Sequence, residues 1–151
     1  MHQRRKAREV TLQVLYALDI QGTGLQEAID LFWANFDAPE EARKFSFILI
    51  EGTWNHREQI DALISGSSEN WTIARMSRVD KSILRMAVYE LLFCKDIPPK
   101  VTLNEAIDLG KVYGSENSGA FINGILDALY GKLRRNDENR DIHGLAGHPE
   151  P

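Results

Sequence analysis

The first residues that suggest a function are four cations at the amino terminus. Residues 1–8 contain Arg4, Arg5, Lys6 and Arg8 and no acid, in a chain whose formal net charge is −4. A helix predicted there already has about half a positive charge at its start, from unpaired backbone amides, so added cations are locally unfavourable. Such cations bind phosphates, and the cluster therefore predicts a polyanion such as RNA as the ligand. An ordinary solvated basic end is the alternative.

An aromatic residue lies on the same face of this predicted helix. Tyr16 follows Arg5 by eleven residues, which is about three helical turns, so the two side chains share one side. An exposed ring offers a stacking surface to an unpaired base, as in many proteins that bind single-stranded RNA. Packing of Tyr16 against a neighbouring helix or a protein partner explains the residue equally well.

A glycine-containing stretch, residues 113–124, forms a second candidate site. It is not a nucleotide-binding loop, because no Gly-Lys-Ser/Thr end follows and no strand is predicted before it. The free amides of a helix that begins near Glu116 could contact a phosphate, with Phe121 one turn further along. A plain helix corner with Phe121 in the core is the alternative. A third feature, the basic strip of Arg78, Lys81 and Arg85, is typical of a solvated helix face.

The histidines and the cysteine give no metal or catalytic pattern. Cys94 has no partner for an internal disulfide, and the four histidines show no metal-ligand spacing with it. Neither a nucleophile motif nor a Cys/His pair is present. We therefore expect no catalytic residue, no metal and no cofactor.

The apolar residues give no membrane or export signal. No apolar run approaches the roughly 18 residues of a membrane span, and the basic start is not followed by the apolar stretch of a signal peptide. We expect a cytoplasmic protein without a membrane partner.

Helical periodicity extends through almost the whole chain, and it predicts an all-α fold. The predicted helices cover about residues 3–20, 25–36, 39–65, 78–95, 102–113 and 116–134, with a further short segment near Trp71. Ser77 with Asp80, and Thr102 with Glu105, have the spacing of capping boxes. Residues 1–135 are therefore expected to form a single compact bundle of six or seven helices, and residues 136–151 a disordered tail.

Three segments, at 4–16, 79–91 and 104–127, together resemble the NusB family. They read Arg-Arg-Lys-Ala-Arg-Glu to Val-Leu-Tyr, then Val-Asp-Lys-Ser-Ile-Leu-Arg-Met-Ala-Val-Tyr-Glu-Leu, then Asn-Glu-Ala-Ile-Asp-Leu-Gly-Lys-Val-Tyr-Gly-Ser-Glu-Asn-Ser-Gly-Ala-Phe-Ile-Asn-Gly-Ile-Leu-Asp. The likeness covers about residues 4–133, in the expected order. One such segment would be a weak signal, but three in order are fairly specific.

The resemblance implies a role in bacterial transcription antitermination, above all at ribosomal RNA operons. The family binds single-stranded boxA RNA together with NusE, a small-subunit ribosomal protein, and helps to recruit the RNA polymerase elongation complex. The resemblance places RNA contacts on the amino-terminal cations and on Phe121, and partner contacts on Tyr16 and Asp80. Asn117, where many family members have an aspartate, is expected to lie close to the RNA.

Two other functions are compatible with these residues. The first is the RNA-binding portion of an rRNA methyltransferase, although only sixteen residues follow residue 135, too few for a catalytic domain. The second is a protein-binding helical scaffold whose basic end serves solubility. The exact RNA sequence, the choice between monomer and homodimer, the detail of the partner-binding face and the role of the tail stay open.

Overall fold

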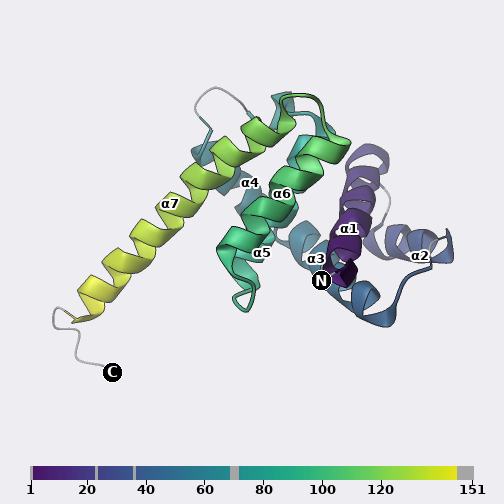
Figure 1. The fold of residues 1–151 in the computed structure, drawn as a ribbon, viewed down its shortest axis with the longest axis horizontal. Helices are drawn as coiled ribbons and strands as arrows, with labels where there is room; N and C mark the ends of the chain where they lie inside the picture. Colours follow the sequence, from purple (N-terminus) through teal and green to yellow (C-terminus); the bar gives the residue numbers. More distant parts are fainter. Residues whose placement is uncertain (1, 23, 36, 69–71, 146–151) are drawn as a thin grey trace.

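The described residues of the computed structural model are 2–22, 24–35, 37–68 and 72–145, and they form an all-α bundle (Figure 1). The α-helices are α1 (His2–Gln21), α2 (Leu25–Asn35), α3 (Glu40–Asn55), α4 (Arg57–Gly66), α5 (Arg78–Phe93), α6 (Pro99–Tyr113) and α7 (Ser118–Leu145), and a short 3-10 helix, η1 (Ile73–Arg75), precedes α5. The prediction of an all-α bundle with six or seven helices is confirmed.

Helix α5 is the centre of the bundle. It packs against α1, α3, α4, α6 and α7, and ten of its sixteen residues are buried. Leu84 and Val88 are among the residues of α5 with no exposed surface. Because α5 is covered on nearly every side, its few charged side chains must find partners on neighbouring helices.

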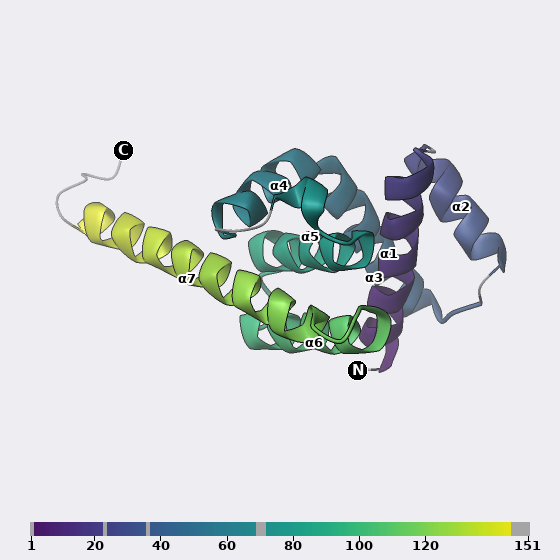
Figure 2. The same cartoon turned by 90° about the horizontal axis from the view of Figure 1, so that it is seen from above.

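The other helices are arranged around α5 in two groups. Helix α1 packs mainly on α3 and α5, and α6 packs mainly on α7 and α5. Seen from above, α1 crosses the ends of α5 and α6, and the carboxyl half of α7 projects beyond the bundle (Figure 2). The amino end of α1 thereby meets α6, and the start of α7 meets the start of α5.

The predicted helix over residues 39–65 is in fact two helices, because the chain breaks at His56. This residue has φ −107° and ψ 15°, and its Nδ1 lies 2.8 Å from the carbonyl oxygen of Gly52. The His56 ring also packs on Phe93, with ring centroids 4.5 Å apart. Gly52 is needed here, because a Cβ at this position would overlap the ring of Tyr89. The break at His56 is thus accompanied by ring packing against α5.

Of the two predicted helix caps, one is confirmed and one is wrong. Ser77 caps α5, and its Oγ accepts a hydrogen bond from the Asp80 backbone amide at 3.1 Å. Thr102 is not a cap, because α6 already begins at Pro99, a residue whose fixed φ favours the first turn of a helix. The Thr102 hydroxyl instead donates to the buried carboxylate of Glu90 at 3.0 Å.

The last helix is longer than expected. We predicted that it ends near residue 134 and that a disordered tail begins at Asn136, but α7 continues to Leu145. The sequence between Asn136 and Leu145 is polar and contains no proline, so nothing in it forces the helix to end before Gly144. Residues 146–151, the rest of the predicted tail, lie outside the described part of the chain.

Candidate nucleic-acid interface

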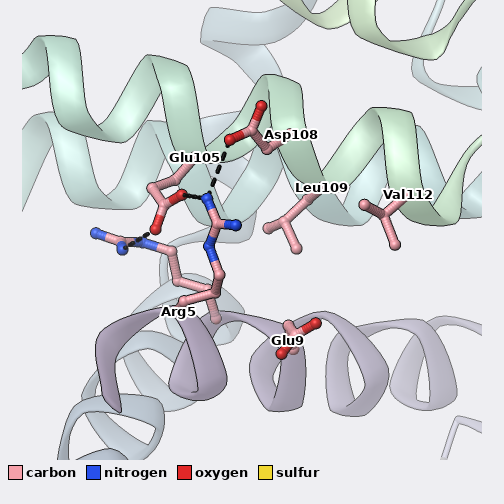
Figure 3. Close-up of a pocket in the computed structure, with 7 residues that line it drawn as sticks. Arg5, Glu9, Glu105, Asp108, Leu109 and Val112 are labelled. Atoms are coloured by element: carbon pink, nitrogen blue, oxygen red, sulfur yellow. Dashed lines mark hydrogen bonds and ion pairs between the residues drawn. The ribbon is translucent and has the colours of Figure 1, made fainter. Parts of the chain in front are cut away.

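Arg5 lies in the seam between the amino end of α1 and α6 (Figure 3). Its Nη2 is 2.5 Å from Oε2 of Glu105 and 3.0 Å from Oδ2 of Asp108. The hydrogen bond and the charge of Glu105, together with Asp108, raise the pKa of Arg5. The Arg5 side chain is nevertheless 54% exposed, so a ligand in solution can reach it.

Arg8, one turn further along α1, has a different environment. Only 3% of its side chain is exposed, and its Nε and Nη2 donate to the two carboxylate oxygens of Glu90, each at 2.8 Å. A third contact, from Nη1 to Glu105, measures 3.3 Å. Burial lowers the pKa of Arg8, but the hydrogen bonds and charge of Glu90 and the charge of Glu105 outweigh it, so the pKa is raised.

These contacts change the role that we assign to Arg8. Its guanidinium joins α1 to α5 and α6 in a buried network, and a phosphate could reach it only if that network opened. The sequence-based expectation treated Arg8 as one of four equivalent RNA contacts. The structure instead gives Arg8 a structural role, because its donors already face Glu90 and Glu105.

The two remaining cations of the cluster are exposed. Arg4 lies over the ring of Phe45, 4.8 Å from the centroid, and its Nη2 is 3.5 Å from a carboxylate oxygen of Asp96. Among the described residues, no carboxylate lies within ion-pair distance of Lys6, which is exposed. Arg4, Arg5 and Lys6 therefore form an accessible cationic edge, which we call the α1 edge.

Asp80, Asn117 and Phe121 meet in a cleft between the start of α5, η1 and the start of α7. The cleft has a volume of about 350 Å³ and is also lined by Arg75. Asn117 is exposed and accepts the backbone hydrogen bond of Phe121 at 3.1 Å, so it precedes the first turn of α7. We call this the α5–α7 cleft.

Two residues of this cleft have unusual environments. Asp80 is only 8% exposed, and its Oδ1 has no hydrogen-bond partner among the described residues. Phe121 is half-buried and packs against the hydrophobic core while it also lines the cleft. The structure thus combines the two alternatives for Phe121, a core residue and a residue that a ligand can reach.

Tyr16 is 38% exposed on α1 and does not line the α5–α7 cleft. The nearby basic strip on α5 forms ion pairs: Lys81 Nζ lies 2.9 Å from Asp19, and Arg85 donates to both carboxylate oxygens of Asp61 at 2.8 and 2.7 Å. Burial raises the pKa of Asp19, but Lys81 and the two arginines of the strip have the larger, opposite effect. The pKa of Asp19 is therefore below its ordinary value. The interpretation of this strip as a solvated face was wrong for Arg85, which is buried.

Sequence reasoning missed three residues of this surface. Glu105 and Asp108 pair with the cations, and the Tyr113 hydroxyl donates to Glu9 of α1 at 2.5 Å. This hydrogen bond is the main cause that raises the pKa of Tyr113. The available signal was the i, i+3 spacing of Glu105 and Asp108, which places two acids on one face of a helix.

The described residues contain neither a candidate metal site nor a helix that could span a membrane. Within these ranges no three His, Cys, Asp or Glu side chains are grouped closely enough to hold a metal ion. None of the helices described combines the length and apolar character needed to cross a membrane.

Solved structures similar to this chain include NusB proteins. T. maritima NusB aligns with a TM-score of 0.77 at 39% sequence identity, over 83% of this chain and 89% of that chain. A chain from a crystal structure of the antitermination factors NusB and NusE in complex with dsRNA aligns with a TM-score of 0.79 at 30% identity. That alignment covers 87% of this chain and 98% of the other.

Sequence comparison agrees with the structural similarity. The NusB family model matches residues 5–131. A transcription antitermination protein NusB from Syntrophus aciditrophicus (strain SB) is 67% identical over 142 residues, which cover 94% of this chain and 88% of that protein. One from Desulfatibacillum aliphaticivorans is 46% identical, over 91% of this chain and 96% of its own length.

The chain belongs to the NusB family of transcription antitermination factors. The resemblance stated from three sequence segments is thereby confirmed. The family is non-enzymatic, which agrees with the expectation that the chain has no catalytic role. The methyltransferase alternative receives no support from these relatives, since each is matched over most of its length.

Proposed function

We propose that this chain binds boxA-type single-stranded RNA of ribosomal RNA operons together with NusE, a small-subunit ribosomal protein. Through this pair it contributes to the RNA polymerase elongation complex in the cytoplasm. The observation that carries the proposal is the presence of two complementary surfaces on one NusB fold, the cationic α1 edge and the α5–α7 cleft. A similar protein in a complex with NusE and dsRNA supports it.

The α1 edge is suited to phosphate binding. Arg4, Arg5 and Lys6 are exposed and lie at the start of one helix, so several phosphates of an extended strand can lie along them. Phosphate contacts of this kind position a nucleic acid without reading its sequence. Arg8 contributes by holding α1 against α5 and α6.

The α5–α7 cleft is suited to base recognition. Phe121 presents a ring on which an unpaired base can stack, and the exposed Asn117 amide can donate to a base edge or a phosphate. This region supplies the contacts that differ between RNA sequences.

Partner binding is proposed at Tyr16 and Asp80. Asp80 lines the cleft, and its buried Oδ1 has no hydrogen-bond partner among the residues described. A cationic side chain of NusE could satisfy this acceptor. Half-exposed Tyr16 can pack on an apolar surface of the same partner. We also propose that the free protein can form a homodimer, which analytical ultracentrifugation would detect.

The proposal is tested by equilibrium binding of a fluorescently labelled boxA-type RNA and of a scrambled RNA with the same composition. We expect tighter binding of the boxA-type RNA, a further gain when NusE is added, and a steep loss of affinity with salt. Equal binding of the two RNAs, with or without NusE, would contradict RNA recognition. Binding of NusE without any RNA binding would favour the protein scaffold.

A further inference from the structure

Glu105 and Asp108 form an acidic pair that faces the amino end of α1. The two residues lie one turn apart on α6, and the guanidinium of Arg5 extends between their carboxylates (Figure 3). Of the three cations on the α1 edge, Arg5 is the one held by two acids. Both carboxylates contact Nη2 of Arg5, so a phosphate that binds at this nitrogen must compete with them.

The exposure of these groups makes such an exchange accessible. Arg5 and Asp108 are about half exposed, at 54% and 49%, and ion pairs between exposed groups contribute little net stability. Asp108 has Arg5 as its one ion-pair partner among the described residues. Glu105 is less exposed and also contacts Arg8, so it is anchored to the buried network.

We propose that Glu105 and Asp108 limit nonspecific RNA binding by competing with RNA phosphates for the guanidinium of Arg5. This inference rests on the proposed RNA-binding function of the same surface. The acidic pair weakens the phosphate contact for every RNA sequence alike. RNA that is also held at the α5–α7 cleft stays bound, whereas RNA held by phosphates alone dissociates.

The physical reason is that phosphate contacts are independent of sequence. They dominate nonspecific binding, which competes with a specific site at every other stretch of RNA. A fixed carboxylate beside Arg5 weakens nonspecific RNA binding and still leaves Arg5 positioned between α1 and α6. The carboxylates thus limit nonspecific occupancy, and the discrimination between sequences comes from the cleft.

Asp108→Asn is the direct test, because it removes one charge at a half-exposed position and leaves the Arg8 network intact. We expect it to tighten binding of scrambled RNA by about two- to five-fold at roughly 50 mM salt, a gain that screening reduces at higher salt. The slope of log K against log salt should become steeper by up to about one phosphate contact. Glu105→Gln should act in the same direction, with thermal unfolding recorded to exclude a change of fold.

Glu58→Gln is the matched control. It also raises the net charge by one, but Glu58 is exposed on α4, a helix that packs on α5 and α7. If the control tightens RNA binding as much as Asp108→Asn does, net charge explains the effect and the inference is overturned. Unchanged RNA affinity in both α6 variants would also overturn it, provided the wild type binds RNA. A wild type that binds no RNA would instead contradict the proposed function itself.

Discussion

The α1 edge and the α5–α7 cleft differ in how the fold arranges their residues. The cations of the α1 edge are neighbours in sequence, and the fold separates them: Arg8 becomes buried, Arg5 lies between two acids, and Lys6 stays exposed. The residues of the cleft are distant in sequence, and the fold brings Asp80 and Phe121 together. A sequence cluster is therefore not yet a binding site, because tertiary ion pairs decide which of its members a ligand can reach.

The α1 edge and the α5–α7 cleft also have different proposed roles in binding RNA. The α1 edge carries charge that acts on any nucleic acid, and part of it is neutralised by α6. The cleft carries one ring, one amide and one carboxylate whose Oδ1 has no hydrogen-bond partner in the described part of the chain, and such groups select particular ligands. The following predictions test this division, beginning with the largest expected effect.

Replacing Arg8 should damage the fold, whereas replacing Arg5 should not. Arg8→Ala leaves the Glu90 carboxylate buried without its guanidinium partner, and we expect a loss of about 3 to 5 kcal/mol in the free energy of unfolding. Arg5→Ala removes exposed ion pairs and should change stability by no more than about 1 kcal/mol. Urea unfolding of both variants makes the measurement. Equal stability of the two would show that the buried Arg8 ion pair contributes no more to the fold than the exposed ion pairs of Arg5.

The alkylation rate of the buried Cys94 thiol tests whether the helices behind the α1 edge stay packed together. Burial, followed by the charges of Glu90 and Asp96, raises the pKa of the Cys94 thiol to about 11. Since the thiolate is the reactive form, the folded protein at about pH 8 should alkylate roughly 100-fold more slowly than an ordinary thiol. The rate should rise with pH towards a midpoint near 11. Fast labelling at neutral pH would mean that this region opens.

Phe121→Ala tests the cleft as a stacking site. If a base stacks on the ring, the variant should lose about 1 to 3 kcal/mol of RNA affinity. Phe121 also packs on the core, so thermal unfolding must be measured in parallel, and binding is compared at a temperature where both proteins are folded. A large loss of stability with full RNA affinity would identify Phe121 as a packing residue alone.

Asn117→Asp should have the smallest effect. A carboxylate just before α7 repels a nearby phosphate and cannot donate a hydrogen bond, so RNA affinity should fall by about several-fold. The loss should be greater at low salt, because charges are screened over roughly 10 Å at about 0.1 M. Thermal stability should hold or rise through the favourable helix-dipole interaction. Equal RNA affinity at low salt would place Asn117 away from the RNA.

Local sequence signals predicted much of the fold. The Ser77 cap and the helix end before Gly114 depend on neighbouring residues, and the structure agrees with both. The break at His56 was missed, because the ring contact with Phe93 that accompanies it lies across the bundle. Thr102 was misread for the same reason, since its hydroxyl bonds to Glu90 on another helix.

Most residues of the candidate site could be predicted from the sequence, but their ion-pair partners could not. The cations near the amino terminus and Phe121 are visible in the sequence, and the structure places Arg5 and Phe121 at accessible positions. The burial of Arg8 could not be predicted, because Glu90 lies 82 residues away. The acids of α6 were overlooked because they oppose the cations only after folding.

Photo-crosslinking tests the central claim most directly, namely that one RNA spans both regions. A boxA-type RNA carrying photoreactive uridines is crosslinked to the wild-type protein in the presence of NusE, and the linked peptides are identified by mass spectrometry. The account predicts crosslinks at the start of α1 and around Phe121 within the same complex, both lost when unlabelled boxA-type RNA competes. Crosslinks confined to other surfaces, such as α2 and α3, would contradict it.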